Sequence, residues 1–174
     1  MTSPISKPAA TCMGRLCVLV LVLFTFVCAH AQHDSTAAPQ PPALTAQLAA
    51  LQRLEALQPD SVSPKYRQAT LLLGYACTWP HDSKTRQYTD QAQRVIGKIE
   101  ALHLTKAADR SDLATLHGFY FTALIVADPQ QNAPRYYRQA LDSFDEALRL
   151  NPGNALARQL QEQFRKVMGQ AGNQ

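Results

Sequence analysis

Cys77 and His81 are the two residues whose types and spacing most directly suggest chemistry. They stand four positions apart in the segment "CTWPH", and a thiol within hydrogen-bond reach of an imidazole can act as a nucleophile with its base. Pro80 would break a helix between them, and Cys77 continues the apolar stripe of the preceding segment. We therefore expect a buried structural cysteine, and a thiol-dependent hydrolase is the alternative.

The remaining histidines and the clustered carboxylates predict little further chemistry. His103 and His117 lack the paired spacing that a metal site needs. Asp142, Asp145 and Glu146 form a short acidic cluster, which we interpret as the solvated face of a helix, the alternative being a docking patch. The sequence contains no glycine-rich phosphate loop and no recognisable catalytic triad. It thus predicts no catalytic residue, no cofactor and no metal, and a protein that is not an enzyme.

Residues 1–31 have the pattern of a secretory signal peptide. Lys7 and Arg15 precede the apolar run "LCVLVLVLFTFVC", and Ala29-His30-Ala31 supplies a small-residue cleavage motif. We expect cleavage after Ala31 and export to the periplasm or to the medium. The apolar run is shorter than the roughly 20 residues that a membrane-spanning helix needs, so no membrane span is expected after cleavage.

The charge and the cysteine content of the chain after cleavage argue against some classes of function. The signal segment carries two of the 17 Lys and Arg residues and none of the 13 acidic residues, so the formal net charge falls from +4 to +2. This small excess, without a clustered basic face, argues against nucleic-acid binding. Cys77 becomes the only cysteine, which excludes an intramolecular disulfide. A lipoprotein beginning at Cys28 is the alternative, although Val27 stands where such signals carry Gly, Ala or Ser.

Apolar residues recur at spacings of three and four from Leu44 onward, which predicts an all-α fold of about six helices. A Pro-rich, disordered tail is expected at 32–43, a helical repeat domain at 44–168 and a C-terminal tail at 169–174. Caps and prolines set the expected boundaries. The expected helix starts are Leu44, Ser63-Pro64, Thr85, Asp109 or Ser111, Ala133-Pro134 and Asn151-Pro152.

Two stretches of the chain resemble each other. The segment "YTDQAQRVIGKIEAL" at 88–102 aligns without a gap with "YYRQALDSFDEALRL" at 136–150, at an offset of 48 residues, and Gly74 aligns with Gly118 at an offset of 44 residues. We expect the four-residue difference to lie in the connection "DPQQNAP", because connections tolerate changes of length. The sequence therefore predicts a repeated helical hairpin with one helix before it and one after it.

The second hairpin resembles the tetratricopeptide repeat, in which small, large and proline residues recur at fixed positions of the second helix. The period differs, because these units repeat at 44 to 48 residues instead of about 34. "HGFYFTALIVADP" and "ALDSFDEALRLNPGN" also resemble units of exported bacterial tetratricopeptide-like proteins. The resemblance assigns the following residues to repeat packing: Gly74, Ala92, Ile96, Gly118, Phe121, Ala140, Phe144, Ala147 and Pro152.

The resemblance implies an α-α superhelix whose first helices line a concave, peptide-binding surface. Arg67, Tyr75 and Tyr120 are the candidate residues of that groove. The expected function is a protein-protein interaction module without catalysis, and the expected partner is an envelope or periplasmic protein or peptide. A structural unit that associates with itself, as a homodimer, is the alternative.

Overall fold

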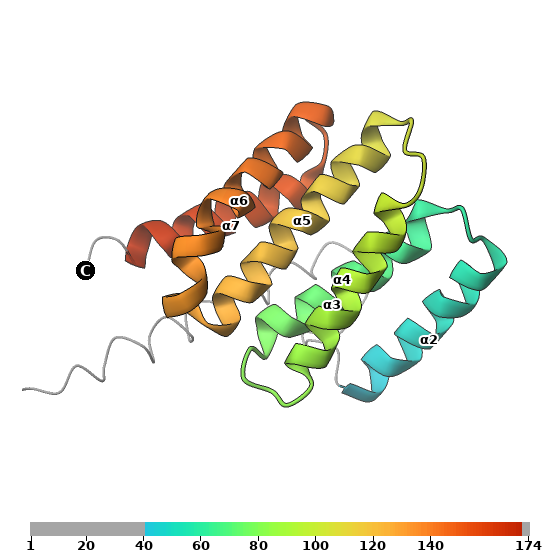
Figure 1. Cartoon of the computed structure of the whole chain (residues 1–174), viewed down its shortest axis with the longest axis horizontal. Coiled ribbons are helices and arrows are strands. Elements are labelled where there is room, and N and C mark those ends of the chain that lie inside the picture. Colours follow the sequence, from blue (N-terminus) through green and yellow to red (C-terminus); the bar gives the residue numbers. More distant parts are fainter. Residues whose placement is uncertain (1–40, 172–174) are drawn as a thin grey trace, which may run out of the picture.

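The computed structural model describes residues 41–171 of the 174-residue chain. Six α-helices and no β-strand occur in this range (Figure 1), which confirms the predicted all-α class. The helices are α2 (Pro41–Leu57), α3 (Val62–Thr78), α4 (Thr85–Glu100), α5 (Ala107–Ala127), α6 (Pro129–Leu150) and α7 (Ala155–Ala171). Within the described part, none of them is long and apolar enough to cross a bilayer. The predicted signal peptide and its cleavage at Ala31 lie outside the described residues.

Consecutive helices run antiparallel, with α2 at one end of the molecule and α6 and α7 at the other (Figure 1). The most extensive contacts join α5 to α6 and α3 to α4, so each predicted hairpin is a packed pair. Further contacts join α3 to α5 and to α2, while α7 packs against α6 and α5. α3 therefore lies between three other helices.

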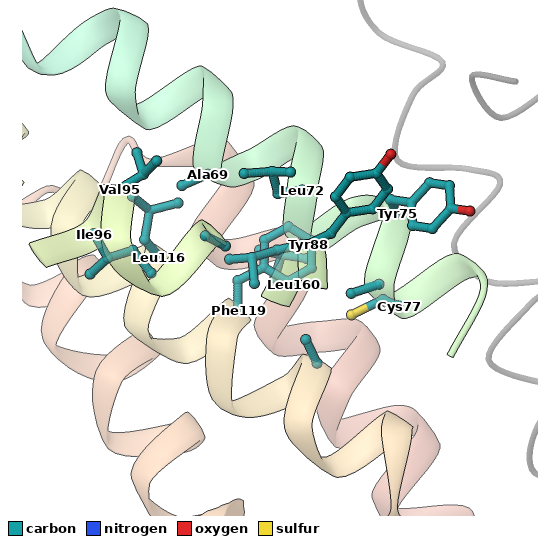
Figure 2. Close-up of a cluster of buried hydrophobic side chains, with 14 of the residues drawn as sticks. Ala69, Leu72, Tyr75, Cys77, Tyr88, Val95, Ile96, Leu116, Phe119 and Leu160 are labelled. Carbon is teal, nitrogen blue, oxygen red and sulfur yellow. The ribbon is translucent and has the colours of Figure 1, made fainter. Parts of the chain in front are cut away.

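The core lies where the two hairpins meet. Leu72 and Ala69 of α3 face Val95 and Ile96 of α4 and Leu116 of α5 (Figure 2). α4 shows why its sequence forms this element, since its buried residues are spaced by three and four positions and leave the charged face outside. α3 instead buries residues around most of its circumference because helices cover it on several sides.

α3 and α5 begin earlier than the N-cap residues in their sequences predicted. α3 starts at Val62 with Ser61 as its N-cap residue, so Ser63 and Pro64 lie inside its first turn. α5 starts at Ala107 after Lys106, and Ser111 is a buried residue inside the helix. The Ser111 hydroxyl does not cap α5; it donates a hydrogen bond to the carbonyl oxygen of Ala147, 2.8 Å away.

The extra residues of the second repeat lie in a helix and not in the connection. α6 begins at Pro129, where the Asp128 side chain accepts a hydrogen bond from the Gln131 amide at 3.1 Å, and Pro134 lies inside the helix. Proline at the first position of a helix is favourable because its missing N–H would have no partner there. Asn132 Nδ2 also donates to the Leu124 carbonyl at 2.6 Å, which ties the new turn to the end of α5. The prediction that Ala133-Pro134 opens this helix is wrong.

The ends of the helical domain also differ from the expected ones. α2 begins at Pro41, inside the predicted tail, and α7 continues to Ala171, past the predicted boundary at 168. α7 starts at Ala155, where the Asn154 side chain accepts a hydrogen bond from the Ala157 amide at 3.0 Å. Asn154, and not Asn151-Pro152, therefore caps the last helix.

Candidate functional site

The predicted packing residues of the second hairpin meet at the seam between α5 and α6. The Phe144 ring is fully buried, and a methyl group placed on Gly118 would lie only 2.5 to 2.8 Å from three of its ring atoms. Ala140 and Ala147 are also fully buried, one turn to either side of Phe144 on α6. The second hairpin thus packs a large ring against a helix surface that has no side chain at Gly118.

The first hairpin does not reproduce this seam in detail. Ala92 and Ile96 are buried in the core as expected, but a Cβ on Gly74 would meet nothing within 4 Å. Gly74 and Gly118 align in sequence and differ in their surroundings. The half-buried Phe121 ring stacks on Tyr136 at a centroid distance of 5.5 Å.

A buried hydrogen-bond network joins α5 to the start of α7. Asn154 Nδ2 lies 2.9 Å from Ser111 Oγ, 3.1 Å from Thr115 Oγ1 and 3.3 Å from Asp112 Oδ1. Burial and the neighbouring charge of Asp109 raise the pKa of Asp112. Pro152 lies in the exposed turn before Asn154 and makes no comparable packing contribution.

Tyr75 belongs to the core and not to an open groove. Its side chain is only 5% exposed, and its ring lies 4.8 Å, centroid to centroid, from both Trp79 and Tyr88. Burial and the hydrogen bond to the Asp82 carboxylate raise the pKa of Tyr75 to about 12. The sequence placed Tyr75 on the concave surface, but the structure turns it inward because α4 packs against that side of α3.

The other two candidate groove residues lie on different parts of the molecule. Tyr120 is half-buried on α5, where burial and the neighbouring Tyr136 raise its pKa. Arg67 is exposed on α3 and lines a groove between α2 and α3. The structure therefore does not bring Arg67, Tyr75 and Tyr120 together in one site.

The groove at Arg67 has a volume of about 420 Å³ and an almost entirely apolar surface. Its walls are Leu51 and Ala50 from α2 and Leu71 and the Tyr66 ring from α3. Burial raises the pKa of Tyr66, and the charge of Asp112 adds to that effect. We call this feature the α2–α3 groove. Leu71 was not among the groove residues predicted from the sequence. The apolar pattern of α3 does not show which of its faces α2 leaves exposed.

Cys77 is completely buried on α3, with its sulfur inside the apolar cluster (Figure 2). Burial raises the pKa of its thiol, since a thiolate would be poorly solvated there. His81 is exposed beyond the end of α3. The nucleophile-and-base arrangement therefore has no support in the geometry.

We expect the Cys77 thiol to resist alkylation in the native protein and to react fully in denaturant, because the thiolate is both inaccessible and disfavoured. The extent of labelling is measured on the tryptic peptide that carries Cys77. Stoichiometric labelling under native conditions would contradict its structural role and reopen the thiol-enzyme interpretation.

The histidines and the acidic cluster make local pairs. His117 Nε2 lies 3.1 Å from Glu100 Oε1, and among residues 41–171 no three His, Cys, Asp or Glu side chains are grouped so as to hold a metal ion. Asp142 pairs with Arg138, Glu146 with Arg149, and Asp145 with Arg165. Such exposed pairs contribute little to stability, and they partly neutralise the face that a docking patch would need.

Comparisons of this chain with protein-family models, with curated proteins and with solved structures gave no match.

Proposed function

We propose that this chain is an exported protein-binding module that holds a helical segment of an envelope or periplasmic protein in the α2–α3 groove. The observation that carries the proposal is the groove itself, an apolar depression of about 420 Å³ between two helices. Concave apolar surface of this kind is typical of sites that bind another molecule. The proposal drops Tyr75 and keeps Arg67 as a contact residue.

The shape and chemistry of the groove favour an amphipathic helix as the occupant. Two adjacent helices with small and large apolar residues between them can accept the apolar ridge of a third helix. Leu51 and Leu71 would contact that ridge, while the exposed Arg67 at the rim would pair with an acidic residue of the partner. Arg is among the residue types that are enriched where such interfaces bind most strongly.

The proposed class, a tetratricopeptide-like repeat, is supported by the two packed helix pairs and by the ring of Phe144 against Gly118. Arrays of helical pairs commonly function by presenting a surface to another chain. Export is supported by the basic residues, apolar run and Ala-x-Ala motif of residues 1–31.

The test is affinity capture from envelope extract with wild-type protein, with Arg67→Glu and with Arg86→Glu as a matched control. Arg67 and Arg86 are both exposed, and Arg86 lies on α4 away from the groove. We expect one specific protein to be retained by wild type and by Arg86→Glu and to be depleted at least about tenfold by Arg67→Glu, as for a rim charge in an ion pair across an interface. Equal retention by all three proteins would overturn the proposal.

A second candidate function is self-association through α2. Leu57 is 80% exposed and Leu54 is 36% exposed, and both lie on the last helical turns of α2 at the end of the array. A homodimer that buries these residues would show a mass that rises with concentration in sedimentation. The capture experiment separates the two functions, because recovery of further copies of this chain alone would favour the dimer.

A further inference from the structure

A second cleft lies on the other flank of α2, between α2 and α4. Its volume is about 550 Å³, and its lining comes from the C-terminal half of α2, from Gln68 of α3 and from one face of α4. No residue is shared with the α2–α3 groove, because the contact between α2 and α3 separates the two. This cleft is therefore a distinct feature, and its lining is much more polar.

Two polar side chains of α3, one lining the cleft and one bonded to its lining residue Pro59, are buried. Gln68 is 1% exposed and donates from Nε2 to Glu55 Oε2 at 2.7 Å. Lys65 is 3% exposed; its ammonium donates to the carbonyl oxygens of Pro59 and Ser61. Buried lysines and glutamines are rare unless their polar groups have partners. Here two of the accepting residues, Glu55 and Pro59, line the cleft.

The residues that line the cleft carry more positive charge than negative charge. Glu55 is the only acidic residue among those that line it, and Lys98 Nζ already contacts its Oε1 at 2.8 Å. Burial alone would raise the pKa of Glu55, but the hydrogen bonds from Lys98 and Gln68 and the charges of Lys98 and Lys65 together lower it. Arg94 stands one turn before Lys98 on the same face of α4, and within residues 41–171 its guanidinium has no hydrogen-bond or ion-pair partner.

Arg94 and Lys98 are the cations that line the cleft and Glu55 is its carboxylate, so the lining carries a local excess of positive charge that is complementary to an anion. The guanidinium of Arg94 and the amide of Gln91, one turn apart on α4, both line the cleft and can donate hydrogen bonds to a carboxylate. Val95, Ala56 and Pro59 add apolar surface for a carbon skeleton.

We propose that the cleft between α2 and α4 binds a small organic carboxylate, with Arg94 as the principal contact and Gln91 and Lys98 beside it. Glu55 opposes the ligand by its charge and holds Lys98 in place. The ligand would bridge α2 and α4, which within the described residues are joined across this cleft by the Lys98–Glu55 pair. This inference does not depend on the protein-binding function proposed for the α2–α3 groove.

The test is isothermal titration of the full chain with sodium succinate at constant ionic strength, with inorganic phosphate and chloride as comparison anions. We expect saturable binding of succinate that Arg94→Gln weakens at least about tenfold, because the substitution removes a charge-assisted hydrogen bond to the carboxylate. Arg86→Gln is the matched control, because Arg86 is exposed on the same helix outside the cleft. It should leave the affinity for succinate unchanged.

Glu55→Gln separates binding from a merely structural role. We expect this substitution to tighten succinate binding several-fold, because it removes the opposing charge and frees Lys98. If the cleft were only structural, loss of the ion pair would have no such effect. Absence of saturable succinate binding, equal binding by Arg94→Gln and wild type, or tighter binding of phosphate than of succinate would each overturn the proposal.

Discussion

Replacement of Phe144 by alanine is expected to lower the free energy of unfolding by about 3 to 5 kcal/mol, the usual cost of removing a fully buried aromatic side chain. Phe144 has no exposed surface and packs against Gly118 of α5 and the Phe164 ring of α7, with a ring-centroid distance of 6.4 Å to the latter. The cavity left by the ring would lie between α5, α6 and α7. The change is measured by urea unfolding followed by circular dichroism.

Tyr137→Ala is the matched control for this substitution. Tyr137 is also an aromatic residue of α6 in contact with Phe164, but its side chain is 39% exposed. We expect a loss of less than about 1.5 kcal/mol, because little apolar surface is removed from the core. If Phe144→Ala cost below about 1 kcal/mol, the assigned seam between α5 and α6 would be wrong.

Substitution of alanine for Gly118 is expected to destabilise the protein by about 1 to 3 kcal/mol, the cost of adding a methyl group to a closely packed core. Alanine normally stabilises a helix interior relative to glycine by about 1 kcal/mol, so the sign of the effect is diagnostic. The added Cβ would lie 2.5 Å from Phe144 Cε1, and a buried ring cannot move aside as a flexible surface chain could.

Gly74→Ala supplies the opposite expectation at the aligned position. Nothing lies within 4 Å of the point that a methyl group on Gly74 would occupy, so we expect a gain of about 0.5 to 1 kcal/mol from helix propensity. A double-mutant cycle then tests the cause, because Gly118→Ala should lose its cost in the Phe144→Ala background. Additive effects of Gly118→Ala and Phe144→Ala would show that the methyl group and the ring do not meet.

The class and the core of this protein were predictable because they depend on periodicity within single helices. Ala140, Phe144 and Ala147 recur at spacings of four and three on α6, and all three are fully buried. The buried face of α4 was equally visible in sequence. In both helices the opposite face is polar, so the pattern alone determines which side faces the core.

The helix boundaries and the exposed surfaces depend on contacts between helices. The periodicity within one helix does not predict those contacts. Ser111 looked like a cap residue, but it binds the Ala147 carbonyl on another helix. Leu57 continued the apolar stripe of α2 and is nevertheless 80% exposed, whereas Leu44 and Leu48 of the same stripe are buried in the core. The cleft at Arg94 was missed for the same reason, since it requires the relative placement of three helices.

Photo-cross-linking in cells tests the proposed binding function most directly. A benzophenone side chain is placed at position 70, which lines the α2–α3 groove, and at position 93, which is exposed on α4 outside both clefts. We predict an adduct with one other protein from position 70 and none from position 93, and its loss when Arg67→Glu is added. The same adducts from both positions, or an adduct at position 70 only with a second copy of this chain, would contradict the proposal.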